Sequence, residues 1–390
     1  MPETKLSDKP YAFVPLQSVK KSGETDKQEW ISQNARLKEG LKSGILSFEC
    51  LVVTPLHIGN GKLRAIIDES SQEMELLHPT TSYKGRPVIP GSSFKGMLRA
   101  VYETFTHSCM VFSPAKKNDG LKRGMPSNMQ GPCKDYKKAC PACSVFGSLG
   151  WRGKIRIPDL ELIEGGTEAI YIPTLKKPFT DYPKKEINED KGNARLYYAH
   201  EGNDGLDQDR RQPQPHFGDM SKNDFYNKFG WDKGPTTICF YGRKFYKLNI
   251  ANPQAGQPNA RRKVQVVTRE SVFQGKIILE GLNNTEWEDL LIALGLGHDN
   301  WHHQLGQGKP AYYGTVKLRN FSFQPVSRFN QEKKNGMEMD ELRKTAAMAL
   351  NRRDQSQQEA LAAMTAIFGN VNGGPSWKAI EGDAKGLLGY

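Results

Sequence analysis

The order in which strand-like and helix-like segments follow one another most constrains the fold of this chain. A strand-length run of β-branched and apolar residues at 45–53 precedes a helical pattern that reaches about residue 105. Further strand-like runs and a second helical pattern follow at 154–162, 169–173, 264–282, 285–294 and 315–323. Apart from one long interruption, this is the β-α-β-β-α-β order of an α+β, ferredoxin-like fold, whose sheet has two helices on one face and one free face.

Capping residues predict where the two core helices begin. Ser92 or Ser93 is expected to cap the first helix, because a serine hydroxyl accepts hydrogen bonds from the free N–H groups of a first turn. Thr285 and Glu288 have the spacing of a capping box at the start of the second helix.

The remaining segments lie outside this pattern. Residues 174–263 are rich in Asn, Asp, Gly, Pro and basic residues, and we interpret them as a large insertion of hairpins and loops. The first segment is polar and aperiodic, whereas small amphipathic helices are expected at 337–350 and 355–368. We therefore divide the chain into an N-terminal arm, a core and a C-terminal helical extension, at residues 1–44, 45–325 and 326–390.

Basic residues are concentrated in one part of the chain. Lys and Arg outnumber Asp and Glu by 55 to 43, and residues 80–156 alone hold fourteen basic and three acidic residues, a net charge of +11. Such a concentration indicates a polyanionic partner, nucleic acid first, although a basic surface can also serve solubility alone. No apolar run approaches the roughly 18 residues of a membrane span, and no apolar signal segment is present, so we expect a cytoplasmic protein.

Four of the six cysteines lie close together in the sequence. In the absence of a secretion signal the thiols are expected to be reduced, which favours metal binding over disulfides. The C-x2-C spacing of Cys140 and Cys143 is typical of a tetrahedral zinc site, which Cys133 and Cys109 could complete, with His107 competing for the fourth position. Redox chemistry and unrelated buried thiols are the alternatives. We predict a structural Zn2+ bound by Cys109, Cys133, Cys140 and Cys143.

Two glycine-rich loops could hold phosphate with backbone N–H groups, at 59–62 and 306–309. Neither has the spacing of a Walker A loop or of a dinucleotide-binding fingerprint. Taken singly, each is better interpreted as a tight turn. Their occurrence together with a basic helix favours an anion-binding role.

Together these motifs resemble a known family. Four blocks of sequence carry the resemblance, at 54–59 (T-P-L-H-I-G), 88–99 (V-I-P-G-S-S-F-K-G-M-L-R), 140–147 (C-P-A-C-S-V-F-G) and the G-x-G-x5-G loop at 306–314. Over roughly residues 45–325 the chain resembles the RAMP proteins of CRISPR effector complexes, especially the backbone subunits of type III complexes. The resemblance implies an RRM-like RAMP core that contains the zinc segment, at 107–147, and the insertion.

The resemblance also implies partners. Such subunits stack with other RAMP and large subunits along a guide (CRISPR) RNA, which recognises target RNA, and a projecting hairpin, the thumb, displaces a base at intervals. We place the thumb in the insertion. Hydroxyls, cations and N–H groups bind phosphate, so binding should tolerate any guide sequence and weaken with salt. The expected RNA contacts are Lys62, Arg64, Ser92, Ser93, Lys95, Arg99, Arg243, Lys244 and Lys309.

A nuclease site is a further implication of the resemblance. Family members that cut target RNA use an aspartate in the loop after the first glycine motif, and Asp68 is the matching residue here. With Mg2+ or Mn2+ it would orient the RNA 2′-hydroxyl for attack on the adjacent phosphate. The alternatives are a non-catalytic structural or capping subunit and, in another class, a guide-RNA-processing endonuclease that uses His57 as general base or acid.

Overall fold

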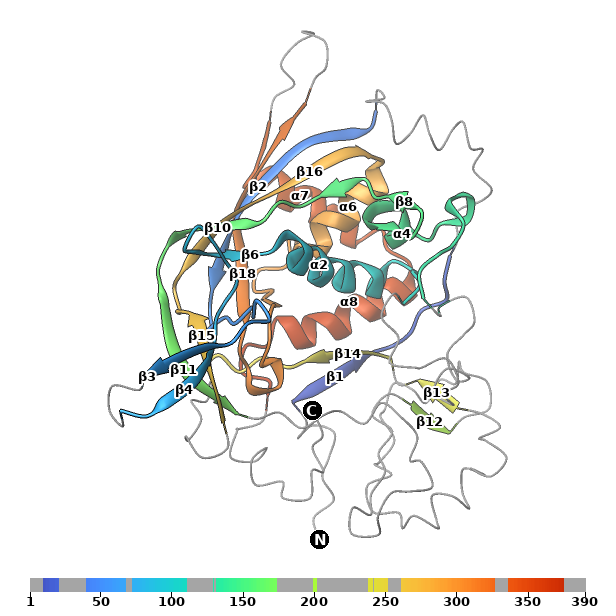
Figure 1. Cartoon of the computed structure of the whole chain (residues 1–390). Helices are drawn as coiled ribbons and strands as arrows, with labels where there is room; N and C mark the ends of the chain where they lie inside the picture. Colours follow the sequence, from blue (N-terminus) through green and yellow to red (C-terminus); the bar gives the residue numbers. More distant parts are fainter. Residues whose placement is uncertain are drawn as a thin grey trace.

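A curled antiparallel sheet dominates the molecule, and the helices gather on one side of it (Figure 1). The computed structural model describes residues 10–20, 40–67, 72–110, 129, 131–173, 199–201, 238–240, 242–251, 261–326 and 336–374. The strand order of the sheet is β17-β18-β2-β16-β10-β6-β5, and β19 pairs with β18 and β9 with β16. The strands are β2 (Lys42–Val52), β5 (Ser82–Tyr83), β6 (Arg86–Ile89), β9 (Ile155–Arg156), β10 (Leu160–Glu164), β16 (Val272–Leu282), β17 (His303–Gln304), β18 (Thr315–Pro325) and β19 (Met337–Glu338). The predicted α+β class is confirmed.

Side-chain alternation explains why one face of this sheet is covered. Along β2, Leu46, Phe48, Cys50 and Val52 are buried, while the residues between them are partly or fully exposed. Successive side chains of a strand point to opposite faces, so these four lie on the buried face of the sheet. The Phe48 ring, for example, stacks on Phe94 of helix α2 with 5.1 Å between ring centroids.

Five α-helices lie among the described residues, together with two short 3-10 turns. The bounds are α2 (Gly91–Phe105), α4 (Pro141–Phe146), α6 (Asn284–Ala293), α7 (Met339–Leu350), α8 (Gln355–Phe368), η3 (Tyr136–Lys138) and η8 (Lys309–Ala311). Among the described residues, none of these helices has the length and apolar character that crossing a membrane requires.

Both predicted helix caps were wrong by a few residues. Helix α2 begins at Gly91 after Pro90, with no side-chain cap. The Gly91 N–H is instead satisfied by the carboxylate of Asp159, at 2.8 Å, a tertiary contact that local sequence does not reveal. Helix α6 is capped by Asn283, whose side chain forms a capping box with Glu286.

Smaller sheets flank the main one. A four-stranded sheet has the order β11-β15-β4-β3, in which β15 and β4 run parallel. Three two-stranded sheets pair β7 with β8, β12 with β13, and β1 with β14. The strands are β1 (Tyr11–Val14), β3 (Arg64–Ile67), β4 (Met74–His78), β7 (Gly147–Ser148), β8 (Trp151–Arg152), β11 (Thr167–Pro173), β12 (Ala199–Glu201), β13 (Ile238–Phe240), β14 (Arg243–Tyr246) and β15 (Arg261–Val267).

The β1–β14 pair alters the interpretation of two predicted segments. Residues 1–44 were expected to form an arm, yet Tyr11 and Val14 of β1 are buried. Strand β14 lies in the predicted insertion but packs with β1 beside α8, where the Phe245 ring contacts Phe368. Most of the insertion, and with it the expected thumb, lies outside the described residues.

Candidate metal centre and nucleic-acid interface

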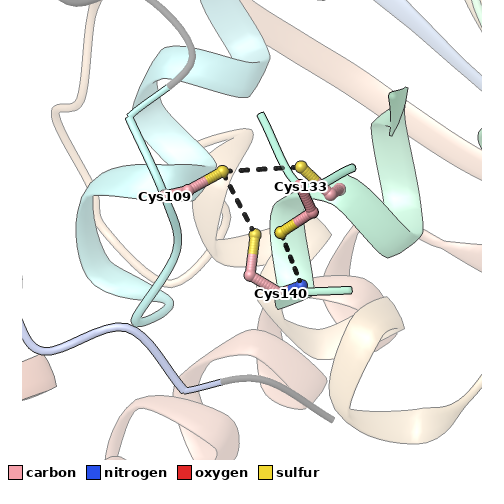
Figure 2. A group of neighbouring side chains, drawn as sticks. Cys109, Cys133 and Cys140 are labelled. Atoms are coloured by element: carbon pink, nitrogen blue, oxygen red, sulfur yellow. Dashed lines mark hydrogen bonds between the residues drawn. The ribbon is translucent and has the colours of Figure 1, made fainter. Parts of the chain in front are cut away.

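The structure brings together the four cysteines that the sequence singled out. The Sγ atom of Cys109 lies 3.5 Å from those of Cys143 and Cys140, and all four sulfurs lie within 4.8 Å of one another. Figure 2 shows the sulfurs of Cys109, Cys133 and Cys140 converging. Tetrahedral Zn2+ with Zn–S bonds of about 2.3 Å places its sulfurs about 3.8 Å apart. The four free, buried thiols therefore fit a metal such as zinc.

Local structure explains this convergence. Cys109 follows the end of α2, and Cys140 and Cys143 stand at the start of α4, where Pro141 occupies the first turn. The Cys140 N–H points at the Cys133 sulfur, 3.4 Å away. The alternative ligand, His107, lies outside the group, because its Nε2 faces Asp354 at 2.8 Å and its Nδ1 faces the Ser18 carbonyl at 3.0 Å.

Hydrogen bonds among the thiols separate their pKa values. A hydrogen bond with Cys109 is the main cause that lowers the pKa of Cys133 to about 7, and another with Cys109 is the main cause that lowers the pKa of Cys140. The pKa of Cys109 is raised, mainly through its hydrogen bonds with Cys133, Cys140 and Cys143. Metal binding by this cluster requires the loss of thiol protons, because the thiolate is the form that binds metal.

Two arginines that were expected to contact RNA lie at this cluster instead. Arg99 donates from Nη2 to the Cys143 sulfur at 3.1 Å and from Nη1 to the Gly147 carbonyl at 2.7 Å. Arg243 donates to Glu103 at 2.7 Å and to the Cys109 carbonyl at 3.2 Å, and its side chain is only 6% exposed. Both guanidinium groups are thus engaged with partners inside the protein, which leaves them less available to RNA than the sequence analysis expected.

The cationic groups of Lys244 and Lys95 are less available to RNA than the sequence suggested. Lys244 Nζ lies 3.9 Å from the centroid of the Tyr11 ring, a cation–π contact that holds it against β1. Burial lowers the pKa of Lys95, whose Nζ donates to the Ile155 carbonyl at 3.3 Å. Ser92 is exposed and Ser93 half-buried in the first turn of α2, so both hydroxyls remain candidates for a phosphate contact.

The two glycine loops, far apart in sequence, lie against each other. The Gln307 N–H donates to the His57 carbonyl at 2.9 Å, and the Gly314 N–H donates to the Pro55 carbonyl at 3.0 Å. Gly306 has φ of +73° and sits so close that a Cβ there would lie 2.3 Å from the His57 carbonyl oxygen. Glycine is therefore required at this position for the loops to meet.

Cations surround the paired loops. Lys62 and Arg64 are exposed beside the first loop. Arg262 donates to the Gln307 side chain at 2.5 Å, and burial lowers the pKa of both Arg262 and Lys309. The site thus combines cationic side chains with a backbone that two glycine loops shape, an arrangement suited to phosphate.

His57 has a structural position between the loops. Its side chain is 2% exposed, and its Nδ1 lies 2.8 Å from the Gln265 carbonyl. Burial is the main cause that lowers its pKa, so the imidazole is neutral at pH 7. A buried ring bonded to backbone agrees better with a role in loop packing than with that of a general base or acid, because a catalytic group has to reach its substrate.

The hairpin of β3 and β4 follows the first loop and exposes apolar side chains. Ile67, Met74 and Leu76 are 67%, 76% and 55% exposed, and β3 is the edge strand of its sheet. Exposed apolar groups in one place indicate an interaction surface. Asp68, the predicted catalytic residue, lies outside the described residues, immediately after β3.

The cationic surroundings of the metal centre and one ion pair beside it were missed by sequence reasoning. The side chains of Lys154 and Glu286 form a buried ion pair at 2.7 Å, and Ser144 of α4 donates to the same carboxylate. The one sequence signal for buried charges beside the cysteines was the four-residue spacing of Arg99 and Glu103, which places both side chains on the same side of one helix.

Comparison with protein families gives a match to the family described as RAMPs, the RAMP superfamily, over residues 49–317. The matched segment covers more than half of the chain, from within β2 to within β18. It therefore includes both glycine loops and all four clustered cysteines. Comparison with curated proteins gives no significant match.

Proposed function

Because this chain belongs to the RAMP superfamily, we propose that it binds guide RNA as a backbone subunit of a type III CRISPR effector complex. Its partners would be the guide RNA, target RNA and the other RAMP and large subunits, in the cytoplasm. The observation that carries this proposal is the pairing of the two glycine loops, since it joins segments about 250 residues apart into one surface that would suit phosphate.

Fewer residues are proposed to contact RNA than the sequence suggested. Lys62, Arg64 and Lys309 lie at the paired loops, and Arg262 joins them through its bond to Gln307. The first turn of α2, with the hydroxyls of Ser92 and Ser93, would form a second contact. Because these groups would contact the phosphate backbone of the RNA and not its bases, binding should not depend on the guide sequence.

The strand order supports a ferredoxin-like core for this subunit. The central strands lie in the order β18-β2-β16-β10, with α2 in the connection from β2 to β10 and α6 in the connection from β16 to β18. This is the order that a β-α-β-β-α-β unit produces. We propose that the core spans residues 45–325, with the zinc segment at 107–147 and the insertion at 174–263.

The exposed β3–β4 hairpin would contact a neighbouring subunit. A backbone subunit has a neighbour on each side along the guide, and the apolar side chains of Ile67, Met74 and Leu76 would be covered on assembly. Target cleavage, with Mg2+ or Mn2+ held near Asp68, is a separate part of the proposal and rests on the sequence resemblance alone.

The assembled complex provides the test. Lys62→Ala/Arg64→Ala should reduce the guide RNA that co-purifies with the subunit, whereas Lys344→Ala, an exposed cation on α7, should not. Equal guide content in wild type and both variants would contradict the proposed surface. Asp68→Ala should remove one target-RNA product in Mg2+ while leaving guide content intact, and an unchanged product ladder would identify a non-catalytic subunit.

A further inference from the structure

A buried network of charges borders the cysteine cluster. Arg99 donates to the Cys143 sulfur, and Arg243 donates to the backbone carbonyl of Cys109. Glu103 lies between them, 2.7 Å from the Nη1 of Arg243 and 3.6 Å from the Nε of Arg99. The side chains of Arg99, Glu103 and Arg243 are 16%, 7% and 6% exposed, so this network is not a surface feature.

We propose that Arg99 and Arg243 are positioning residues of the metal centre, which offset its charge and couple metal binding to attachment of the N-terminal strand. The inference rests on metal binding by the four cysteines and not on RNA binding.

The two arginines would balance the negative charge of the metal centre. Four thiolates around a divalent ion carry a net charge of −2, and a buried charge is costly unless it is paired. Two guanidinium groups and one carboxylate supply +1 at the edge of the cluster. Arg99 also gives the Cys143 sulfur an N–H donor, and such outer contacts orient metal ligands and tune their basicity.

Backbone contacts link the region around Cys109 to the N-terminal strand. Arg243 belongs to β14 and pairs in register with Val14 of β1. The segment that precedes Cys109 also holds the chain after β1, because the His107 carbonyl accepts from the Lys20 N–H at 2.9 Å and the His107 N–H donates to the Gln17 side chain. A metal that fixes Cys109 therefore fixes the anchor points of the N-terminal segment.

The test uses the purified full chain. Zinc content, zinc affinity by chelator competition and the absorption spectrum of the Co2+ form would be measured for wild type, Arg99→Met, Arg99→Lys and Arg243→Met. Arg152→Met is the matched control, because Arg152 lies on β8 next to the zinc segment but is 62% exposed.

We expect Arg99→Met and Arg243→Met to weaken zinc binding by roughly 10–100-fold. Arg99→Met should also move the sulfur-to-cobalt charge-transfer band to lower energy, since Cys143 loses its donor, and Arg99→Lys should restore part of both changes. Arg152→Met should behave as wild type. Circular dichroism identifies variants that fail to fold. If Arg99→Met is one of them, the zinc affinity and cobalt spectrum of Arg99→Lys, compared with wild type, test the role of Arg99.

Hydrogen exchange tests the coupling. Removing zinc from wild type should increase exchange at β1 and β14 more than at β16 in the centre of the main sheet. A wild-type protein without metal, Arg variants that bind zinc within twofold of wild type, or unchanged exchange at β1 would each overturn the inference. Guide-RNA content measured in parallel reports on the proposed function separately.

Discussion

The buried ion pair of Lys154 and Glu286 gives a stability prediction that can be worked out from the structure. Lys154 Nζ donates to both oxygens of the Glu286 carboxylate, at 2.7 and 2.8 Å, and the two side chains are 7% and 9% exposed. The carboxylate also accepts from the Ser144 hydroxyl at 2.7 Å and from the Asn283 N–H at 3.0 Å. One carboxylate therefore ties the zinc segment to the start of α6.

The variant Lys154→Met keeps the packing of the aliphatic stem and removes the cation. Breaking a buried pair on one side costs about 3–5 kcal/mol, because the remaining charge stays buried. The two neutral donors that remain on Glu286 place the expected loss near the lower end, about 3 kcal/mol. In Lys154→Met/Glu286→Gln no charge is left, and Gln retains the capping box of α6, so this double variant should be more stable than the single one.

Chemical denaturation of zinc-saturated protein, followed by tryptophan fluorescence, would measure these free energies of unfolding. Arg152→Met is the control, since its exposed pair with Glu280 is expected to contribute at most about 1 kcal/mol. A loss below about 1 kcal/mol for Lys154→Met, or a double variant no more stable than the single one, would show that no costly buried charge is left on Glu286.

Three further predictions concern the loops and pH. Removing Lys62 and Arg64 together should reduce the slope of log affinity for single-stranded RNA against log salt by about 1.4, with Lys344→Ala as the unchanged control. Gly306→Ala should lower the melting temperature and RNA affinity together, since its Cβ would overlap the facing carbonyl, and normal values for both would contradict the loop pairing. Burial lowers the pKa of His303 to about 4 from 6.5. Its contribution to stability is therefore present above pH 6.5 and lost as pH falls toward 4, by up to about 3 kcal/mol, and His303→Gln should show a flatter acid dependence in denaturant titrations.

Features set by local sequence were predictable. The alternation in β2 and the three- and four-residue spacing in α2 come from nearest neighbours along the chain, and α8 occupies the expected 355–368. The four clustered cysteines were also predictable, because a metal site imposes its own spacing on the sequence.

Features set by distant partners were not predictable. Strand β1 has four residues in a polar segment, and its partner β14 is more than 200 residues away. For the same reason, the sequence did not show that the Arg243 side chain points into the protein. It does so because it forms a buried ion pair with Glu103, which is distant in sequence. The basic stretch at 80–156 likewise includes Lys154, which is buried in its pair with Glu286 and is not free for a polyanion.

Binding of guide RNA at the paired loops can be tested directly by UV crosslinking of the assembled complex and mass spectrometry of the peptide–nucleotide adducts. We predict adducts in both paired loops, at 56–64 and 305–309, for guides of unrelated sequence. Adducts confined to other parts of the subunit, or a subunit that assembles without guide RNA, would contradict the account.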